Sequence, residues 1–365
     1  MSAVIEGSTP FQNRHLGDPD QLAADPGQSV EAYALPDLRI GGLVLAPFNP
    51  DANKFAPCDG SVINPLIYPQ VPPAYVFADQ TILDKNYRGL AVSDAGLFVV
   101  VADSDVVAQT SSDGETWAAQ AAAIPSATLG LHCLAYGAGL FVLVYTNSCY
   151  TSPDGATWTS RAIGVAAWEV VHYANSMFVA TGGGGAMAYS ADGINWTNVV
   201  PISADNFAAI SYGSGKWVVL ANNTCYTSPD AINWTERTIP NGSWMDVTYG
   251  NGVFVAVGDG GVCAYSYDGI DWVSNNFSAG GANLAIDFNG HVFLTIDDSI
   301  DGYVSKDGVT WHTIATSPSV EVNEIANYGG RFVAVAASGT TNLTADVEGP
   351  TLTGNNDWEY WLKVA

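Results

Sequence analysis

The stretch SPDGATW, residues 152–158, decides the fold of this chain because five close copies of it occur at nearly equal intervals. The repeated Asp residues are Asp113, Asp154, Asp192, Asp230, Asp268 and Asp307. The Trp residues that close the copies are Trp117, Trp158, Trp196, Trp234, Trp272 and Trp311. Successive Asp residues are 41, 38, 38, 38 and 39 residues apart. A fixed period of this length is typical of a repeat architecture.

A second anchor precedes each Asp phrase and consists of a glycine turn, an aromatic residue and a β-branched run. Its aromatic residues are Phe98, Phe141, Phe178, Trp217, Phe254, Phe293 and Phe332, which makes seven units. The seventh unit begins near residue 323 and has a degraded Asp phrase, TADVEGPTLT, before a predicted closing strand, DWEYWLKVA (357–365).

Each unit contains four short β-rich runs bounded by turn residues. In the second unit these are LHCLAY (131–136), LFVLVY (140–145), CYTS (149–152) and the run with Trp158. Four antiparallel strands per period predict an all-β fold, a seven-bladed β-propeller over residues 81–365. We expect the ring to close by pairing of residues 358–364 with a strand within residues 74–83. A stacked β-solenoid is the alternative, but its periods are usually shorter.

The repeated phrase resembles the Asp-box, or BNR repeat, of sialidases and many other propellers. In local terms, each Asp accepts hydrogen bonds from backbone N–H groups of its own turn, and the adjacent Gly tolerates a positive φ. The Trp then covers the hairpin. We therefore interpret the six Asp residues as structural; a metal or catalytic role is the alternative. The fourth copy has Ala231 where the others have Gly, which is unfavourable if the site is left-handed.

The N-terminal residues 1–80 do not repeat, and we expect a small, partly extended attachment region there. Residues 38–71 resemble the tail-collar motif of bacteriophage tail fibres. The matching residues are Gly41, Gly42, Phe55, Cys58, Asp59, Gly60, Ser61, Tyr68 and Pro69. This resemblance implies attachment to other virion proteins. The alternative is a turn in an N-terminal cap that matches by chance.

Composition excludes several classes of function. With 11 Lys and Arg against 36 Asp and Glu, the formal net charge is −25, so nucleic acid and anionic membranes are poor partners. No apolar run is long enough to span a membrane, and the N-terminus does not have the pattern of a secretory signal. Five scattered cysteines argue against a disulfide framework, and the five histidines have no metal-ligand spacing. We expect no cofactor and no metal; an acidic loop at 297–301 is the one weak candidate for Ca²⁺.

One repeat position varies while its neighbours do not, and it is expected to lie at the mouth of the central channel. The candidate ligand-binding residues there are Arg88, Trp168, Phe207, Trp244, Asn283 and Asn323. Aromatic rings and amides in one ring of side chains favour sugar binding. The alternative is that these rings fill the core.

The arginines argue against sialidase activity. Sialidases that resemble this repeat use three converging Arg residues, whereas the repeat region has only Arg88, Arg161, Arg237 and Arg331, and only Arg88 is expected at the mouth. We therefore predict a non-catalytic bacteriophage virion protein, a tail fibre or receptor-binding protein, assembled in the bacterial cytoplasm and contacting a host glycan or protein. A homotrimer is one arrangement considered. The alternatives are a structural or decoration protein of the virion and a sialidase-like glycan-processing enzyme.

Overall fold

The computed structural model describes residues 77–103, 108–120, 129–221, 223–277, 281–298, 301–314, 321–336 and 341–346. The chain divides into two units, Met1–Val71 and Pro72–Ala365, and all described residues belong to the second. The collar-like segment 38–71 and the predicted closing strand near 358–364 lie outside the described residues.

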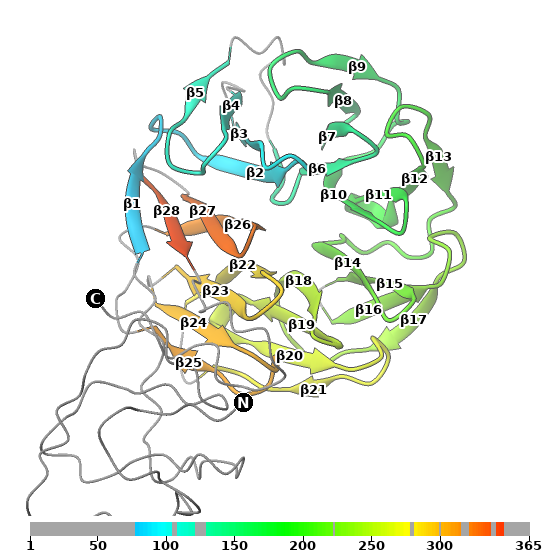
Figure 1. Cartoon of the computed structure of the whole chain (residues 1–365). Helices are drawn as coiled ribbons and strands as arrows, with labels where there is room; N and C mark the ends of the chain where they lie inside the picture. The colour runs from blue at the N-terminus through cyan, green and yellow to red at the C-terminus, as the bar shows by residue number, and fades with distance from the viewer. Residues whose placement is uncertain are drawn as a thin grey trace, which may run out of the picture. The chain divides into compact units, whose positions relative to one another are not determined.

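Short strands in seven four-stranded antiparallel sheets make up the described part of the chain (Figure 1). Blade 1 contains β2 (Tyr87–Val92), β3 (Phe98–Ala102), β4 (Ala108–Ser111) and β5 (Ala118–Ala119). Blade 2 contains β6 (Leu134–Gly137), β7 (Leu140–Tyr145), β8 (Ser148–Ser152) and β9 (Thr159–Arg161). Blade 3 contains β10 (Trp168–Ala174), β11 (Met177–Gly182), β12 (Met187–Ser190) and β13 (Thr197–Val199). Blade 4 contains β14 (Ala209–Gly213), β15 (Lys216–Leu220), β16 (Thr224–Ser228) and β17 (Thr235–Thr238). Blade 5 contains β18 (Trp244–Gly250), β19 (Val253–Gly258), β20 (Cys263–Ser266) and β21 (Val273–Ser274). Blade 6 contains β22 (Asn283–Phe288), β23 (Phe293–Asp297), β24 (Gly302–Ser305) and β25 (His312–Thr313). Two short 3₁₀ turns, η1 (Gly183–Gly185) and η2 (Asp259–Gly261), join the second and third strands of blades 3 and 5.

The remaining sheet is composite, and here the expected architecture needs correction. Only six sheets are formed by one continuous repeat each; the last combines β26 (Val322–Tyr328), β27 (Arg331–Ala336) and β28 (Thr341–Asp346) with β1 (Phe77–Thr81) from the other end of the unit. The predicted seventh repeat, running to a closing strand at the C-terminus, is wrong. β1 pairs with β28, from Phe77 opposite Ala345 to Thr81 opposite Thr341. The degraded phrase begins inside β28, so this strand needs no Asp turn to a fourth strand of its own.

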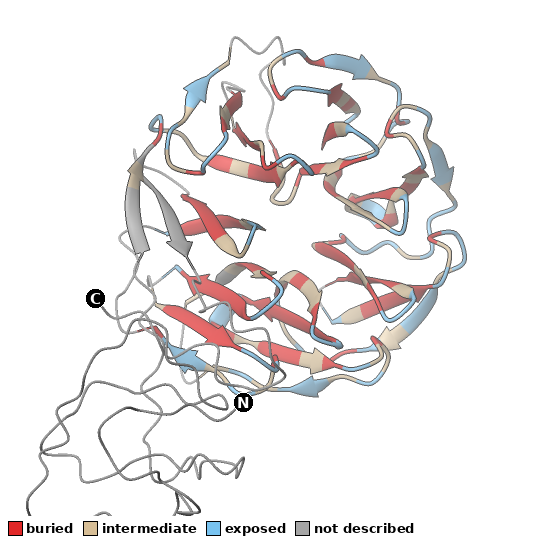
Figure 2. Ribbon diagram, in the orientation of Figure 1, coloured by how far each residue is buried: buried red, intermediate tan, exposed pale blue. Residues whose placement is uncertain are grey.

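The first strands of the blades form the inner ring. Each of β2, β6, β10, β14, β18, β22 and β26 contacts the next, and β26 contacts β2. The second and third strands are almost wholly buried, whereas the outer strands are largely exposed (Figure 2). The core therefore lies between neighbouring blades, where the faces of adjacent sheets pack together. Cys149, Cys225 and Cys263 occupy equivalent buried positions in third strands.

The repeated Asp phrase forms the turn between the third and fourth strands. In blade 2, Oδ1 of Asp154 accepts hydrogen bonds from the backbone N–H groups of Ala156 and Thr157 at 2.9 and 2.7 Å. The Trp158 indole donates to the carbonyl of Gly155 at 3.1 Å. The Gly that follows the Asp has a left-handed φ in every described copy that carries one, and Ala231 has a φ of 61°. The carboxylates therefore act as acceptors inside their own turns.

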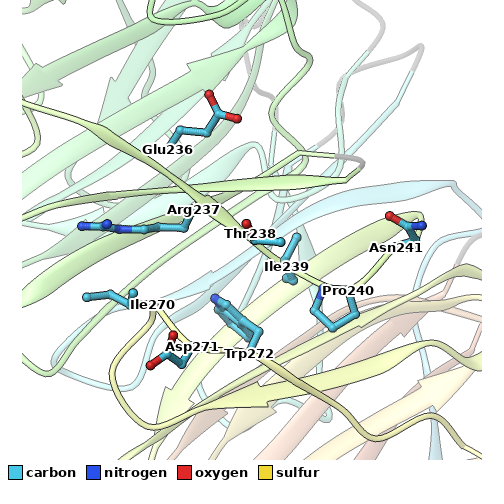
Figure 3. A pocket seen from close by; sticks show the side chains of 9 residues that line it. All are labelled: Glu236, Arg237, Thr238, Ile239, Pro240, Asn241, Ile270, Asp271 and Trp272. Atoms are coloured by element: carbon cyan, nitrogen blue, oxygen red, sulfur yellow. The ribbon is translucent and has the colours of Figure 1, made fainter.

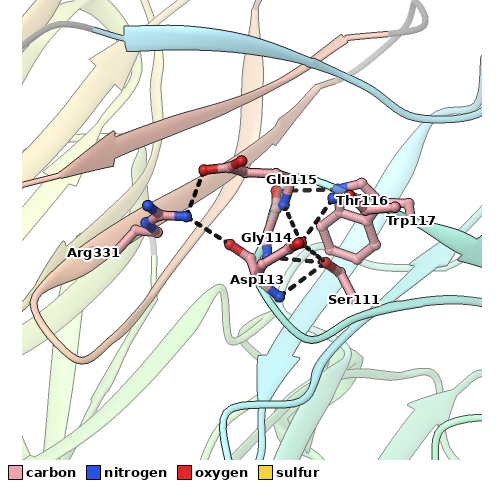
Figure 4. Close-up of polar contacts among 7 residues, drawn as sticks. All are labelled: Ser111, Asp113, Gly114, Glu115, Thr116, Trp117 and Arg331. Atoms are coloured by element: carbon pink, nitrogen blue, oxygen red, sulfur yellow. Dashed lines mark hydrogen bonds and ion pairs between the residues drawn. The ribbon is translucent and has the colours of Figure 1, made fainter.

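Contacts from one blade to the turn of the next link the blades at this face. Arg331 of blade 7 donates to the carbonyl of Asp113 at 2.9 Å and to Oε1 of Glu115 at 2.7 Å (Figure 4). Lys216 of blade 4 donates to the carbonyl of Asp268 at 2.8 Å, and the side-chain amide of Asn251 donates to the backbone carbonyl of Lys306 at 3.0 Å. The contacts of Arg331 thus also link the composite blade 7 to blade 1, where the ring closes. Among the described residues, none forms a helix with the length and apolar character needed to cross a membrane.

Candidate functional site

Strand register determines where the predicted mouth residues lie. Trp168 and Trp244 pair with Gly182 and Gly258, and a bulge follows each of them. The equivalent residues in blades 1, 6 and 7 are Tyr87, Asn283 and Val322. The residues that pair with Phe98 and Phe332 are Val92 and Asn327, not Ser93 and Tyr328. The repeat alignment that gave Arg88 and Asn323 therefore differs from the observed register by one residue in blades 1 and 7.

The aromatic members of the predicted ring are core residues, which corrects the expectation that they are exposed at the mouth. Trp168 and Trp244 are each 2% exposed, and Phe207 is 0% exposed. Trp168 packs with Cys149 and Phe178, and Trp244 has the equivalent position in the next interface but one. The physical reason is that first-strand side chains face the neighbouring blades rather than the axis of the ring.

The polar members of the predicted ring do not form one site either. Asn323 is buried and bridges blades 7 and 1, donating to Oδ1 of Asn86 at 2.9 Å and to the carbonyl of Tyr87 at 2.7 Å. Arg88 lies in the bulge of β2 and is half-buried. Asn283 is placed by its backbone in β22. The structure therefore distributes the predicted residues among blade interfaces.

An acid–base cluster that the sequence did not predict lies within the inner ring. His132 precedes β6 of blade 2 with a φ of 57°, and its Nδ1 lies 3.0 Å from Oε2 of Glu324 in blade 7. Its Nε2 lies 3.8 Å from Oδ1 of Asp246 in blade 5. One imidazole thus joins blades that are not neighbours in the ring.

The charges in this cluster change the pKa values of its members. Burial alone lowers the pKa of His132, but the carboxylates of Asp246 and Glu324 outweigh it and raise that pKa to about 10. Burial lowers the pKa of His172 to about 4, and the charge of His132 adds to this effect. Burial raises the pKa of Asp246 to about 6 although His132 opposes the shift. No group of three or more His, Cys, Asp or Glu side chains within the described ranges is arranged to hold a metal ion. The contacts of His132 with Glu324 and Asp246 link blades 2, 7 and 5 within the inner ring.

An open groove of about 710 Å³ lies on the outer side of the propeller, between blades 4 and 5. Its walls are β17 with the segment that follows, and the Asp turn of blade 5 (Figure 3). In Figure 3, Ile270 and Arg237 lie at one end of the groove and Asn241 at the other. The nine lining residues are Glu236, Arg237, Thr238, Ile239, Pro240, Asn241, Ile270, Asp271 and Trp272. The volume is within the range of small-ligand sites.

The groove combines an aromatic face with an oriented guanidinium and two carboxylates that no other described side chain engages. Trp272 is half-buried and packs against the core cluster that contains Ile239. Nε of Arg237 donates to Oγ1 of Thr227 at 3.1 Å, which orients the guanidinium. Within the described part of the chain, the carboxylates of Glu236 and Asp271 have no hydrogen-bond partner. These groups are free to bond a ligand.

The interface between blades 2 and 3 supplies an internal comparison. Arg161 pairs with Cys149 as Arg237 pairs with Cys225, and its Nε likewise donates to a Thr hydroxyl, at 2.9 Å. Trp196 stands where Trp272 stands in the groove. The residues at the positions of Glu236, Thr238, Asn241 and Asp271 are Ser160, Ala162, Val165 and Asn195. The same backbone arrangement thus carries fewer charged and polar groups there.

The loop over the groove differs from its counterpart in one buried contact. The indole N–H of Trp168 donates to the carbonyl of Gly164 at 3.2 Å. Pro240 is the residue equivalent to Gly164, and the buried indole N–H of Trp244 has no hydrogen-bond partner among the described residues. A buried donor without a partner is unfavourable. The loop that borders the groove therefore lacks a hydrogen bond to a buried indole that its counterpart forms.

Sequence reasoning missed the groove but contained one signal for it. Only the fifth Asp phrase, SYDGIDW, has an acid immediately before its Trp; the other five have Thr or Asn there. The acid–base cluster had no such signal. Asp246 and Glu324 both stand directly after the bulge of their strands, but they share this repeat position only in the observed register of blade 7, and His132 does not share it.

Comparison with known proteins shows the fold alone. No family model matches the chain, and no curated protein matches it. Virginiamycin B lyase from Staphylococcus aureus is similar in structure with a TM-score of 0.66 at 12% identity, over 74% of this chain and 99% of that one. YCF48 bound to a D1 peptide is similar with a TM-score of 0.61 at 12% identity, over 76% of this chain and 96% of that one. The WD40 domain of Neurospora crassa Pan2 is similar with a TM-score of 0.60 at 8% identity, over 79% of this chain and 98% of that one. The protein has a β-propeller fold, and because a lyase and a peptide-bound protein share it, the fold does not decide whether this chain is catalytic.

Proposed function

We propose that this protein is a non-catalytic recognition component of a bacteriophage virion, a tail fibre or receptor-binding protein, whose propeller binds a host surface glycan. The groove between blades 4 and 5 is the observation that carries the proposal. It offers an indole face beside carboxylate, amide, hydroxyl and guanidinium groups, the combination that suits the C–H faces and hydroxyls of sugars. The site lies there rather than at the mouth.

Virion attachment rests on the resemblance of residues 38–71 to the tail-collar motif. In this proposal residues 1–80 bind other virion proteins, and the propeller is displayed towards the host. The net charge of −25 supports a partner other than nucleic acid or an anionic membrane. A structural or decoration protein is the second candidate; it predicts protein contacts and no glycan binding.

The arrangement of arginines argues against a sialidase-like enzyme. Arg161 and Arg237 lie on outer strands of blades 2 and 4, and Arg331 contacts the turn of blade 1. Arg88 lies in the bulge of an inner strand. A carboxylate clamp needs three converging guanidinium groups, but two of these four arginines lie on outer strands and a third is bonded to an Asp turn.

A glycan array probed with the full chain tests the proposal. We expect binding to a defined set of glycans, lost in Trp272→Ala and kept in Trp196→Ala, the matched change at the interface of blades 2 and 3. Absence of glycan binding by the native chain, or equal binding by both variants, contradicts it. Hydrolysis of fluorogenic sialosides by the native chain would restore the enzyme reading.

A further inference from the structure

The Asp turns share a hydrogen bond that blade 5 lacks. In four turns the side chain three residues after the Asp donates to Oδ2 of that Asp. These bonds are Thr157 to Asp154 at 3.2 Å, Asn195 to Asp192 at 2.8 Å, Asn233 to Asp230 at 2.8 Å and Thr310 to Asp307 at 3.1 Å. Blade 1 also has a donor type there, Thr116. Blade 5 has Asp271, whose ionised carboxylate has no proton to donate.

Asp271 also places a like charge next to the carboxylate of its own turn. Its backbone N–H still bonds Oδ1 of Asp268, at 3.0 Å, so the turn itself is kept. Two neighbouring carboxylates repel each other, and the exchange loses one hydrogen bond besides. A residue that breaks a local rule without a compensating internal contact marks a functional position.

The carboxylate of Asp271 faces the groove instead. Asp271 is exposed, has no side-chain partner among the described residues, and lines the groove beside Trp272 and Arg237 (Figure 3). Glu236 adds a second carboxylate to the lining. Carboxylates accept strong hydrogen bonds from hydroxyl and ammonium groups and repel other anions.

From these observations we infer that Asp271 is the specificity-determining residue of the groove, which selects a glycan with hydrogen-bond donors and no negative charge. The inference rests on the proposed function and names its ligand class. Sugar hydroxyls donate to the Asp271 carboxylate while one sugar face lies on Trp272. An amino sugar satisfies the same carboxylate through its ammonium group. Sialylated and uronic-acid glycans are excluded by Asp271 and Glu236 together.

Replacement of Asp271 by Asn separates binding from stability, because Asn is the residue that blades 3 and 4 carry at this position. In Asp271→Asn the amide can donate to Asp268 as Asn195 does to Asp192, so thermal stability should rise. Affinity for the array-selected glycan should fall at least tenfold. The matched control Asn195→Asp, in the turn of blade 3, should lower stability and leave glycan affinity unchanged.

The array separates the two sources of donors and the possible failures. Neutral hexose glycans and glycans with free amino sugars should bind, and sialylated or uronic-acid glycans should not. If Asp271→Asn binds as tightly as the native chain while Trp272→Ala has lost binding, the role of Asp271 is overturned and the groove remains. Selection of acidic glycans by the native chain also overturns it. Unchanged binding by Trp272→Ala overturns the proposed function itself.

Discussion

His132 and Glu324, which are separated by 192 residues in the sequence, meet within the inner ring with Nδ1 and Oε2 3.0 Å apart. The backbone N–H of His132 bonds the other oxygen of the same carboxylate. Blade 7 supplies the carboxylate, and its sheet also contains β1 from the beginning of the folded unit. The contact therefore ties blade 2 to the composite blade that completes the ring.

The pKa values of His132 and His172 should lie on opposite sides of the ordinary histidine value. Carboxylates raise the pKa of His132 to about 10, and burial lowers that of His172 to about 4. Below pH 6.5 the unfolded chain protonates His172 and the folded chain does not, so this residue reduces stability as the pH falls from about 6.5 to about 4. His132 stabilises the fold below about pH 6.5, and that contribution is lost as the pH rises through about 10. Histidine NMR titration measures both; a midpoint near 6.5 for either contradicts the assignment, and Glu324→Gln should lower the pKa of His132.

Removal of a turn acceptor should destabilise the fold without affecting ligand binding. In Asp154→Ala two backbone N–H groups lose their acceptor in a largely exposed turn, at a cost of about 1 kcal/mol. Denaturant unfolding measures the loss, and the glycan array is the control. Loss of binding with unchanged stability would show that this Asp has a role beyond its turn.

Trp244 should behave as a core residue. Because it is 2% exposed and packs with Phe254 and Ala264, Trp244→Ala should lower the free energy of unfolding by about 3–5 kcal/mol. Trp168→Ala should have a similar effect in the equivalent interface. Melting temperatures of both variants equal to that of the native chain would contradict the assignment of these two residues to the core.

Replacing a turn glycine by Ala should lower stability much more than replacing Ala231 by Gly. A Cβ on Gly193, at a φ of 70°, would lie 2.7 Å from Cγ2 of Val142, so Gly193→Ala should destabilise by at least about 1 kcal/mol. Ala231 already occupies the equivalent left-handed site and is buried. Ala231→Gly relieves backbone strain but adds freedom to the unfolded chain, so its effect should stay within about 1 kcal/mol. Calorimetry of the two variants measures the contrast, and equal, large losses in both would contradict the explanation.

The strand pattern could be predicted because it repeats, and the contacts between blades could not. Turn residues and β-branched runs recur in each unit, so the fourfold strand order follows from local chemistry. A single extra residue between Val92 and Phe98 shifted the alignment of blade 1, and side-chain direction reverses with each residue along a strand. The burial of Trp168 depends on the packing of neighbouring sheets, which a strand's own sequence does not specify. Asp271 alone of the groove residues departs from a pattern that the other repeats define.

Hydrogen–deuterium exchange of the full chain with the array-selected glycan tests the central claim most directly, because it locates the binding site. We expect slower exchange on binding in residues 235–241 and 268–273, and unchanged exchange in the matched segments 159–165 and 192–197. Protection confined to the face opposite the Asp turns, or protection spread equally over both pairs of segments, would contradict a site in the groove between blades 4 and 5.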